Sequence, residues 1–185
     1  MNEMLNVVRI KKEKIFPETI DFRSELSTIV QGLRSNDAFY SVKRNFDIDN
    51  KKELHTDKKL LNLVLHNLID NAIKYHNPES DSFLNVKVTD YMHGVKIFVE
   101  DNGCGFKEST RDNIFNMFNK GNYKSEGNGL GLYVVKNAID RLGGYIELSC
   151  ETGTNTIFSI FLPDLFSANQ WVGKEDENSP VKANV

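Results

Sequence analysis

The sequence Gly127-Asn128-Gly129-Leu130-Gly131-Leu132 runs directly into an apolar, helix-like segment at 133–139. Three alternating glycines allow a backbone to approach a ligand closely. The N-terminus of a helix presents free N–H groups and the positive end of the helix dipole, which suit an anion such as phosphate. Glycines also serve turns that bind nothing, so this stretch alone predicts either a phosphate cradle or a flexible loop that caps a helix.

A second glycine cluster, Asp101-Asn102-Gly103-Cys104-Gly105-Phe106, ends an apolar, strand-like segment. Six of the twelve glycines in the chain lie between Gly103 and Gly131, so we expect the fold to bring the two loops together. Asp101 is suited to accept a hydrogen bond from the exocyclic amine of adenine. An aspartate before Asn-Gly also commonly bonds its own turn, and both interpretations are open at this point.

Outward from the two loops, the hydrophobic pattern predicts a series of helices and strands. The expected helices, the first two with Asp21 and Asp57 as N-caps, cover 22–33, 58–75, 110–118 and 131–142. The expected strands, two of which form a hairpin around Met92-His93-Gly94, cover 39–48, 54–56, 83–89, 95–100, 145–150 and 156–162. Short connections between consecutive strands favour a two-layer α/β sandwich, with a mixed, mostly antiparallel sheet and helices on one face.

The composition excludes several functional classes. A chain of 185 residues, 39% hydrophobic and 26% charged, suits one globular domain. Its net charge of −3 provides no basic field for nucleic acid. The two cysteines lack metal-ligand spacing, so we expect free thiols. No apolar run approaches the roughly 20 residues of a membrane span and no signal peptide is present, so we expect a cytoplasmic fragment without membrane contact, whose parent protein can still be membrane-anchored.

Three segments are expected along the chain. Residues 1–15 have apolar positions at helical spacing followed by lysines, and they look like either the end of a helix that begins upstream or a frayed terminus. Residues 16–165 hold the strands and both glycine loops and form the globular domain. Residues 166–185 are polar and charged, and we expect them to be disordered.

Asn67, Asn71 and Lys74 fall on one narrow stripe of the long helix, at about 100° per residue. The broad opposite face is apolar and carries Leu61, Val64, Leu65, Leu68, Ile69 and Ala72. Two amides one turn apart, followed by a lysine, can hold a hydrated Mg²⁺ and a polyphosphate, because Mg²⁺ prefers oxygen ligands and keeps several waters. A polar helix face in contact with water would carry the same pattern.

The sequence excludes three other glycine-loop sites. A P-loop needs Gly-Lys-Ser/Thr after its second glycine, and the chain has none. A dinucleotide-binding loop needs a glycine at the position of Leu132 and a strand directly before the loop, where this chain has a polar segment. The His-Arg-Asp loop of protein serine/threonine/tyrosine kinases is absent as well.

Four motifs occur in order: Asn67 to Tyr75, Asp101-x-Gly103-x-Gly105, Phe115 with Phe118, and Gly127-x-Gly129-Leu130-Gly131-Leu132. Together they resemble the N, G1, F and G2 boxes of the ATP-binding catalytic domain of sensor histidine kinases, in the GHKL superfamily. Segment 153–158 resembles the box that follows, and the resemblance covers residues 16–163. It implies the Bergerat fold, in which ATP lies between helices and a flexible lid, here the short segment 119–126.

The resemblance implies a phosphate side of the site. Asn71 would be the Mg²⁺ ligand, Asn67 would lie beside it near the phosphates, and Lys74 would reach a phosphate. Lys120 stands where relatives often have an arginine for the γ-phosphate, and lysine supplies the charge without the bidentate fork. Asn67, Lys74 and Lys120 are therefore the expected catalytic residues. Backbone N–H groups of the second loop would face the phosphates, at Gly127, Gly129, Leu130, Gly131 and Leu132.

The resemblance also implies an adenine side. Asp101 would accept a hydrogen bond from the adenine amino group, Tyr75 would flank the nucleotide, and Phe118 would pack behind the lid. The remaining implied residues shape the pocket or the sheet end, and they are Gly103, Gly105 and Thr156. One departure from the family is Asn155, where relatives usually have a second glycine. Asparagine tolerates a left-handed backbone better than most residues, so the turn can persist.

The implied function is transfer of the γ-phosphoryl group of Mg-ATP to a histidine. None of the four histidines, at positions 55, 66, 76 and 93, lies in the context of a phosphoacceptor, and we expect each at the surface or in a turn. The acceptor would belong to a separate dimerisation domain of the parent protein, whose last helix residues 1–15 resemble. A response regulator would act downstream. We expect the isolated domain to be a monomer.

Three other functions are open for the same fold. They are ATP hydrolysis, as in gyrases, chaperones and mismatch-repair proteins, serine phosphorylation by a partner-switching kinase, and nucleotide-dependent regulation without kinase activity. Hydrolysis needs a general base for water, and such ATPases have a glutamate one turn before the metal-binding asparagine. Asn67 occupies that position here, which favours transfer over hydrolysis. The intact Asn71, Asp101 and glycines favour an enzyme over a regulatory module.

Overall fold

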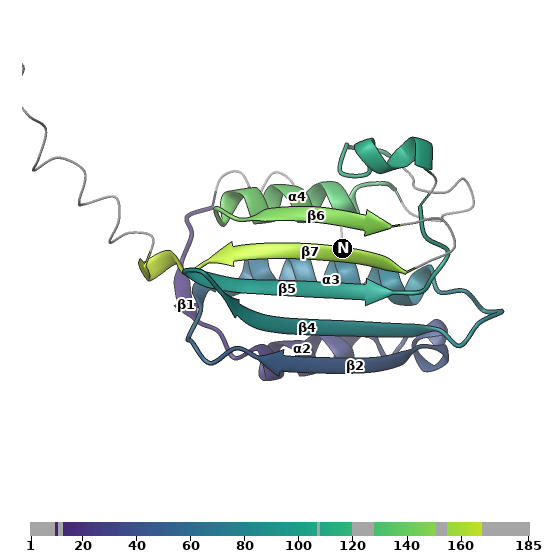
Figure 1. Ribbon diagram of the computed structural model, residues 1–185, viewed down its shortest axis with the longest axis horizontal. Helices are drawn as coiled ribbons and strands as arrows, with labels where there is room; N and C mark the ends of the chain where they lie inside the picture. Colours follow the sequence, from purple (N-terminus) through teal and green to yellow (C-terminus); the bar gives the residue numbers. More distant parts are fainter. Residues whose placement is uncertain (1–9, 11–12, 107, 120–127, 151–154, 168–185) are drawn as a thin grey trace, which may run out of the picture.

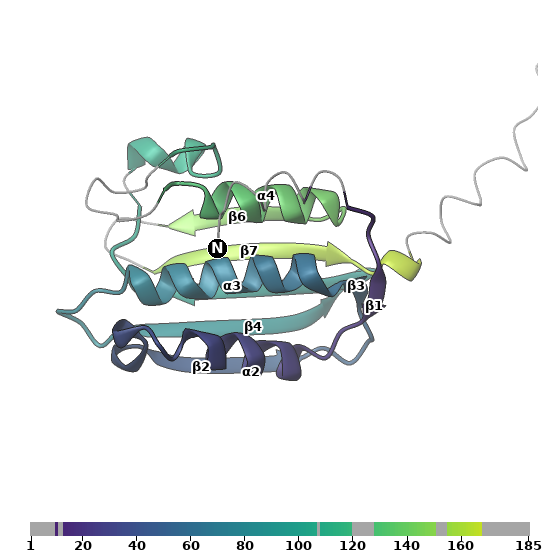
Figure 2. The same ribbon diagram turned by 180° about the vertical axis from the view of Figure 1, so that it is seen from behind.

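The computed structural model describes residues 10, 13–106, 108–119, 128–150 and 155–167. In this part of the chain, a five-stranded sheet carries helices on one face, and no described helix or strand covers the other (Figure 1). Figure 2 shows the three long helices side by side across the sheet. The helices are α2 (Phe22–Leu33), α3 (Lys58–Lys74) and α4 (Gly131–Arg141), with two short 3-10 helices, η1 (Asp37–Ser41) and η2 (Glu108–Asn113).

The strands of the main sheet lie in the order β2-β4-β5-β7-β6. β2 is parallel to β4, and the other neighbouring pairs are antiparallel. β1 and β3 form a separate antiparallel pair at one end of the molecule. The strands are β1 (Pro17–Thr19), β2 (Lys43–Asp49), β3 (His55–Asp57), β4 (Phe83–Tyr91), β5 (Gly94–Asp101), β6 (Tyr145–Cys150) and β7 (Thr156–Pro163). This arrangement confirms the predicted two-layer α/β sandwich with a mixed, mostly antiparallel sheet.

Both predicted N-caps are present. The carboxylate of Asp21 accepts hydrogen bonds from two N–H groups in the first turn of α2, at 3.0 and 3.3 Å. Asp57 does the same for α3, at 3.1 Å for both bonds. Such a side chain satisfies N–H groups that have no partner within the helix. The second oxygen of Asp57 accepts a hydrogen bond from the backbone N–H of Phe16 at 3.0 Å, so one carboxylate ties the start of the domain to α3.

Three local predictions are wrong. The expected strand 39–48 begins only at Lys43, because the Asn36 side chain accepts a hydrogen bond from Ala38 N and starts the 3-10 turn η1 instead. β1 was not predicted, since three residues that include a proline give no alternating pattern; a proline suits such a short edge strand. The expected helix 110–118 is the 3-10 helix η2, which begins earlier and ends at Asn113.

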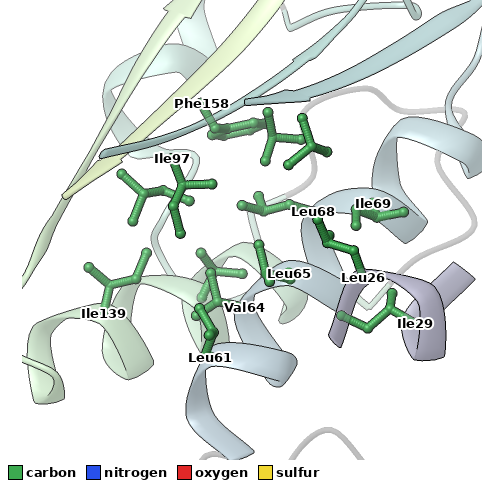
Figure 3. Close-up of a cluster of buried hydrophobic side chains, with 14 of the residues drawn as sticks. Leu26, Ile29, Leu61, Val64, Leu65, Leu68, Ile69, Ile97, Ile139 and Phe158 are labelled. Atoms are coloured by element: carbon green, nitrogen blue, oxygen red, sulfur yellow. The ribbon is translucent and has the colours of Figure 1, made fainter. Parts of the chain in front are cut away.

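The core lies between α3 and the sheet. α3 is central among the helices, and its apolar face turns toward side chains from β5, β7 and α4 (Figure 3). Leu61, Leu65 and Ile69 are fully buried there, together with Ile97 of β5 and Ile139 of α4. This burial leaves the opposite stripe of α3, which carries the predicted polar residues, outside the core.

The remaining composition-based predictions concern cysteines and membranes. Cys104 is exposed and Cys150 is buried, and both are free thiols, as expected. Among the described residues, no helix is long and apolar enough to cross a membrane.

Candidate functional site

The glycine loop and the start of α4 form the first part of the candidate site. Gly129 has a φ of +66°, and a Cβ there would come within 2.8 Å of the carbonyl oxygen of Asn119. The Gly129 carbonyl accepts a hydrogen bond from Phe118 N at 3.0 Å, so the two segments that flank the expected lid lie side by side. α4 begins at Gly131 with Leu130 as its N-cap residue, and the Leu130 side chain makes no capping hydrogen bond. The first N–H groups of such a helix are suited to bind an anion.

Asn67 on α3 faces the start of α4. Its amide nitrogen donates to the carbonyl oxygen of Leu63, one turn earlier, at 2.7 Å. Its amide oxygen lies 3.2 Å from the position that a Cβ on Gly131 would occupy. A side chain at position 131 would therefore crowd Asn67, whose amide would have to shift by a few tenths of an ångström. The structure thus joins the predicted polar stripe of α3 to the predicted glycine loop.

Asn71 and Lys74 follow Asn67 along α3. Asn71 is half-buried and Lys74 is exposed, so both lie at the rim of the helix layer rather than in the core. The Lys74 ammonium lies 5.5 Å from the ring centroid of Tyr75, within the range of a cation–π contact. Figure 2 shows that the C-terminal end of α3 and the N-terminal end of α4 lie at the same end of the sheet.

Asp101 ends β5 at that same end of the sheet. Its side chain is buried, at 9% exposure, and the one hydrogen bond that it accepts from a described residue comes from Gly103 N at 2.9 Å. Burial raises the pKa of Asp101 to about 6; the Gly103 N–H acts against this rise, and the charge of Glu100 adds to it. A buried carboxylate with spare acceptor capacity suits a ligand that brings a hydrogen-bond donor.

The loop after Asp101 packs against the end of α3. A Cβ on Gly103 would lie 2.5 Å from the carbonyl oxygen of Tyr75, a contact that no side chain could make without displacing the backbone. The same carbonyl accepts a hydrogen bond from Cys104 N at 2.9 Å. Gly103 therefore allows the first glycine cluster to approach the helix that carries Asn67 and Asn71.

Thr156 completes this end of the sheet. It is fully buried and stands opposite Asp101 in the β5–β7 register. Gly105 has a φ of +61°, and its missing Cβ would lie 3.6 Å from the Cys150 sulfur and 3.9 Å from the Thr156 hydroxyl. Gly105 therefore lies in contact with the end of β6 and the start of β7.

A family model described as "Histidine kinase-, DNA gyrase B-, and HSP90-like ATPase" matches residues 56–165. The chain belongs to this ATPase family. Among its relatives is the sensor protein RprX of Bacteroides fragilis, which is 30% identical over 183 residues. That alignment covers 88% of this chain and 35% of RprX, so the chain spans about a third of that relative's length.

Solved histidine kinases have the same fold as this ATPase domain. Full-length ShkA in complex with AMPPNP is 21% identical, with a TM-score of 0.74 over 88% of this chain and 34% of ShkA. ThkA in complex with the response regulator TrrA is 19% identical, with a TM-score of 0.69 over 88% of this chain and 46% of ThkA. The Bergerat fold expected from the sequence is therefore confirmed.

The predicted residues of the ATPase site are only partly covered by the structure. Lys120 and Gly127, and most of the expected lid, lie outside the described residues. Phe118 is described, has a φ of +64° and is 59% exposed, so its expected packing behind the lid stays a prediction. Phe115 instead packs toward the core, with its ring 6.4 Å from that of Phe158. Leu130 is buried and Leu132 partly buried, so these two contribute packing as well as backbone.

One expectation about the histidines is wrong. His55 is not a surface or turn residue: it lies in β3, and its ring nitrogen Nδ1 lies 2.8 Å from the carboxylate of the buried Asp164. His66 and His93 are exposed, and His76 is half-buried with its ring nitrogen 2.9 Å from the carbonyl of Ile73. No local pattern indicates the His55–Asp164 pair, because its members are 109 positions apart.

Proposed function

We propose that this domain transfers the γ-phosphoryl group of ATP to a histidine on a separate phosphoacceptor domain, as the catalytic part of a sensor histidine kinase. Relatives of the chain are sensor kinases, which supports the proposal. The observation that carries it is the meeting of three features at one sheet end. They are the buried carboxylate of Asp101, the start of α4 and the amide oxygen of Asn67 that faces it.

In this proposal Asp101 accepts a hydrogen bond from the adenine amino group, and Gly103, Gly105 and Thr156 shape the pocket around it. Tyr75 flanks the nucleotide. The triphosphate then extends toward α4, where backbone N–H groups of the glycine loop bind it. A helix N-terminus and lysine side chains together neutralise phosphate charge without any rearrangement during the reaction. Lys74 and Lys120 are the lysines assigned to this task.

The residues of α3 fit a magnesium ion bound mainly by the nucleotide. Within the described residues, no group of three or more His, Cys, Asp or Glu side chains could hold a metal. Mg²⁺ is commonly bound through one or two protein oxygens, substrate phosphates and water, so an amide oxygen from Asn71 is a sufficient contribution. When bound, the ion neutralises the developing charge on the phosphates. Asn67 lies one turn before Asn71 on α3 and is proposed to lie near the same phosphates.

Phosphoryl transfer needs little covalent chemistry from the domain. A neutral imidazole nitrogen of the acceptor attacks the γ-phosphorus, the bond to the bridging oxygen breaks, and ADP leaves with that electron pair. The domain positions the nucleotide and stabilises charge. Asn67 cannot act as a strong base toward water, because an amide has no basic lone pair on nitrogen, and this favours transfer over the hydrolysis of gyrase-like ATPases.

The domain boundaries follow from the same proposal. Residues 1–15 belong to the end of the upstream dimerisation helices, 16–165 form the catalytic domain, and 166–185 form a polar tail. A histidine-bearing dimerisation domain and a response regulator are the proposed protein partners, and no nucleic acid or membrane surface is needed.

The test is a phosphotransfer assay with this chain, Mg-ATP and the histidine-bearing helices of the parent protein. We expect acid-labile, base-stable phosphohistidine on the helices, lost in Asn71→Ala. Asn137→Ala is the matched control, because Asn137 is a half-buried helix asparagine that donates to the carbonyl of Tyr133 at 2.7 Å and has no role in the proposed site. Absence of transfer, or transfer undiminished in Asn71→Ala, would refute the proposal. Asn67→Glu tests hydrolysis: native ATP turnover already equal to that of the variant would favour an ATPase.

A further inference from the structure

A carboxylate on the open face of the sheet joins three strands at the end of the sheet where Asp101 lies. Glu100 of β5 accepts a hydrogen bond from the side-chain amide of Asn155 at 2.6 Å on one oxygen. Its other oxygen accepts one from the side-chain amide of Asn85, on β4, at 3.2 Å. Asn155 directly precedes β7. One side chain therefore ties β4, β5 and the start of β7 together, and hydrogen bonds to a charged acceptor are among the stronger ones in proteins.

The two residues that follow this bridge are the ones that enclose the adenine end of the proposed site. Asp101 follows Glu100, Thr156 follows Asn155, and Asp101 and Thr156 are partners in the β5–β7 register. Successive side chains of a strand point to opposite faces. The bridge therefore lies on the open face, while Asp101 and Thr156 are buried on the helix face directly behind it.

The bridge depends on the side chain of Asn155. The family box that segment 153–158 resembles implies a glycine at this position, and a glycine has no side chain that could donate to Glu100. The hydrogen bond from the Asn155 amide to Glu100 fixes the backbone at position 155, where a glycine would leave the backbone more conformational freedom. Asn85 alone would hold β4 to β5 and leave the start of β7 without this tie.

We propose that Glu100, held by Asn85 and Asn155, is a positioning residue for adenine recognition: it acts through the backbone to hold Asp101 opposite Thr156. This inference rests on the proposed function, since it assumes that Asp101 reads adenine. Glu100 touches neither the adenine nor the phosphates. Its loss therefore weakens discrimination between bases more than binding of the triphosphate.

The test compares Glu100→Gln and Asn155→Gly with the unmodified chain, by measuring dissociation constants for ATP and, by competition, for GTP. Glutamine keeps the length and one acceptor oxygen, but its nitrogen meets a second donor. We expect ATP affinity to fall roughly 3- to 10-fold in each variant, an effect of the size of one ordinary intramolecular hydrogen bond. We expect GTP affinity to change less than about twofold, because the phosphate contacts are intact. The preference for ATP over GTP then falls by nearly the whole loss in ATP affinity.

The double variant Glu100→Gln/Asn155→Gly shows whether the two residues act as one unit. The effects of substitutions within one hydrogen-bonded group do not add. We therefore expect the double variant to bind ATP no more weakly than the single variant with the lower ATP affinity. Glu147→Gln is the matched control, since Glu147 is an exposed glutamate on β6, and its replacement should leave both affinities unchanged. Thermal unfolding of each variant is measured alongside.

Three outcomes overturn the inference: unchanged ATP affinity in both single variants, equal losses for ATP and GTP, or additive losses in the double variant. If Glu100→Gln fails to fold, Asn155→Gly still decides the matter, because it removes only the donor from Asn155 and leaves Glu100 and Asn85 in place. If the unmodified chain binds ATP but shows no effect of the variants, only this inference fails. If the unmodified chain does not bind ATP, the proposed function itself fails.

Discussion

Two buried aspartates lie at opposite ends of the central strands, and they are used in opposite ways. Asp101 ends β5 and accepts one hydrogen bond from the described residues, and its pKa is raised by burial to about 6. Asp164 follows β7 at the other end (Figure 1). Burial by itself would raise its pKa too, but hydrogen bonds from Ser167 N and from the backbone and ring of His55 lower it to about 2.

The difference shows that the charged form of Asp101 is destabilised in the fold, whereas the charged form of Asp164 is stabilised. A carboxylate with several donors is stabilised in its charged form, whereas one with a single donor pays a desolvation penalty that a ligand can relieve. Asp164 joins β3 to the segment after β7, and its carboxylate accepts hydrogen bonds from protein donors alone. Among the described residues Asp101 accepts a hydrogen bond from Gly103 N only, so a ligand that brings a further donor could stabilise its charged form.

The largest effect is expected from Asp101→Asn. The asparagine oxygen can still accept from Gly103 N, but its nitrogen then meets the adenine amine, so ATP affinity should fall on the order of 100-fold. Folding raises the Asp101 pKa, so the folded state binds more protons between about pH 4 and 6 and stability falls as pH rises through that window. The neutral variant should therefore be more stable at pH 8 by on the order of 1–2 kcal/mol.

Calorimetric titration with ATP and chemical denaturation at pH 4 and pH 8 measure both effects of Asp101→Asn. The stability gain should disappear at pH 4. A variant that is less stable than the unmodified chain at pH 8, or one that binds ATP normally, would contradict the contrast between the two aspartates.

Asp164→Asn should have the opposite effects: it should lower stability near neutral pH and leave ATP affinity almost unchanged. Folding lowers the Asp164 pKa, so its stabilising effect is present above about pH 4 and is lost as pH falls toward 2. At pH 7 the amide nitrogen would face the His55 donors, and we expect a loss of about 2–3 kcal/mol of unfolding free energy with little change in ATP affinity. Asp140→Asn removes an exposed i,i+4 partner of Lys136 and serves as the control, with an effect below about 0.5 kcal/mol. An equal loss in both variants, measured by urea denaturation, would be the contrary result.

The smallest effects are expected from two glycines. Gly103→Ala places a Cβ against the Tyr75 carbonyl at the Asp101 end, and we expect a loss of about 1–2 kcal/mol together with weaker ATP binding. Gly32→Ala lies within α2 with no atom within 4 Å of the new Cβ, and we expect a gain of about 0.5–1 kcal/mol and no change in binding. Denaturation curves and ATP titrations of both variants test this, and similar behaviour of the two would argue against a close approach at Gly103.

Local signals predicted most of the fold. Asp21 and Asp57 are followed by helical patterns and cap the helices as expected, and the hairpin around His93 forms because two alternating runs flank a short turn. The errors arise where a side chain acts locally without a pattern, as Asn36 does for η1. β1 was missed because its partner strand lies about 40 residues further along, beyond the reach of local patterns.

The site was predictable as residues but not as geometry. The spacing of Asn67, Asn71 and Lys74 follows from the helical period alone. That the oxygen of Asn67 faces Gly131 depends on how α3 packs against α4, which no local pattern contains. The tie between Glu100 and Asn155, 55 positions apart, and the His55–Asp164 pair are likewise products of the sheet register.

The carboxylate of Asp57 has a mechanical consequence. One of its oxygens holds the chain at Phe16, and the other holds the first turn of α3. α3 is a rod of 17 residues, or roughly 25 Å at 1.5 Å per residue. Its far end carries Asn71 and Lys74. A pull or twist on the backbone before Pro17 therefore acts on one end of a stiff helix whose other end carries the residues proposed to bind the nucleotide.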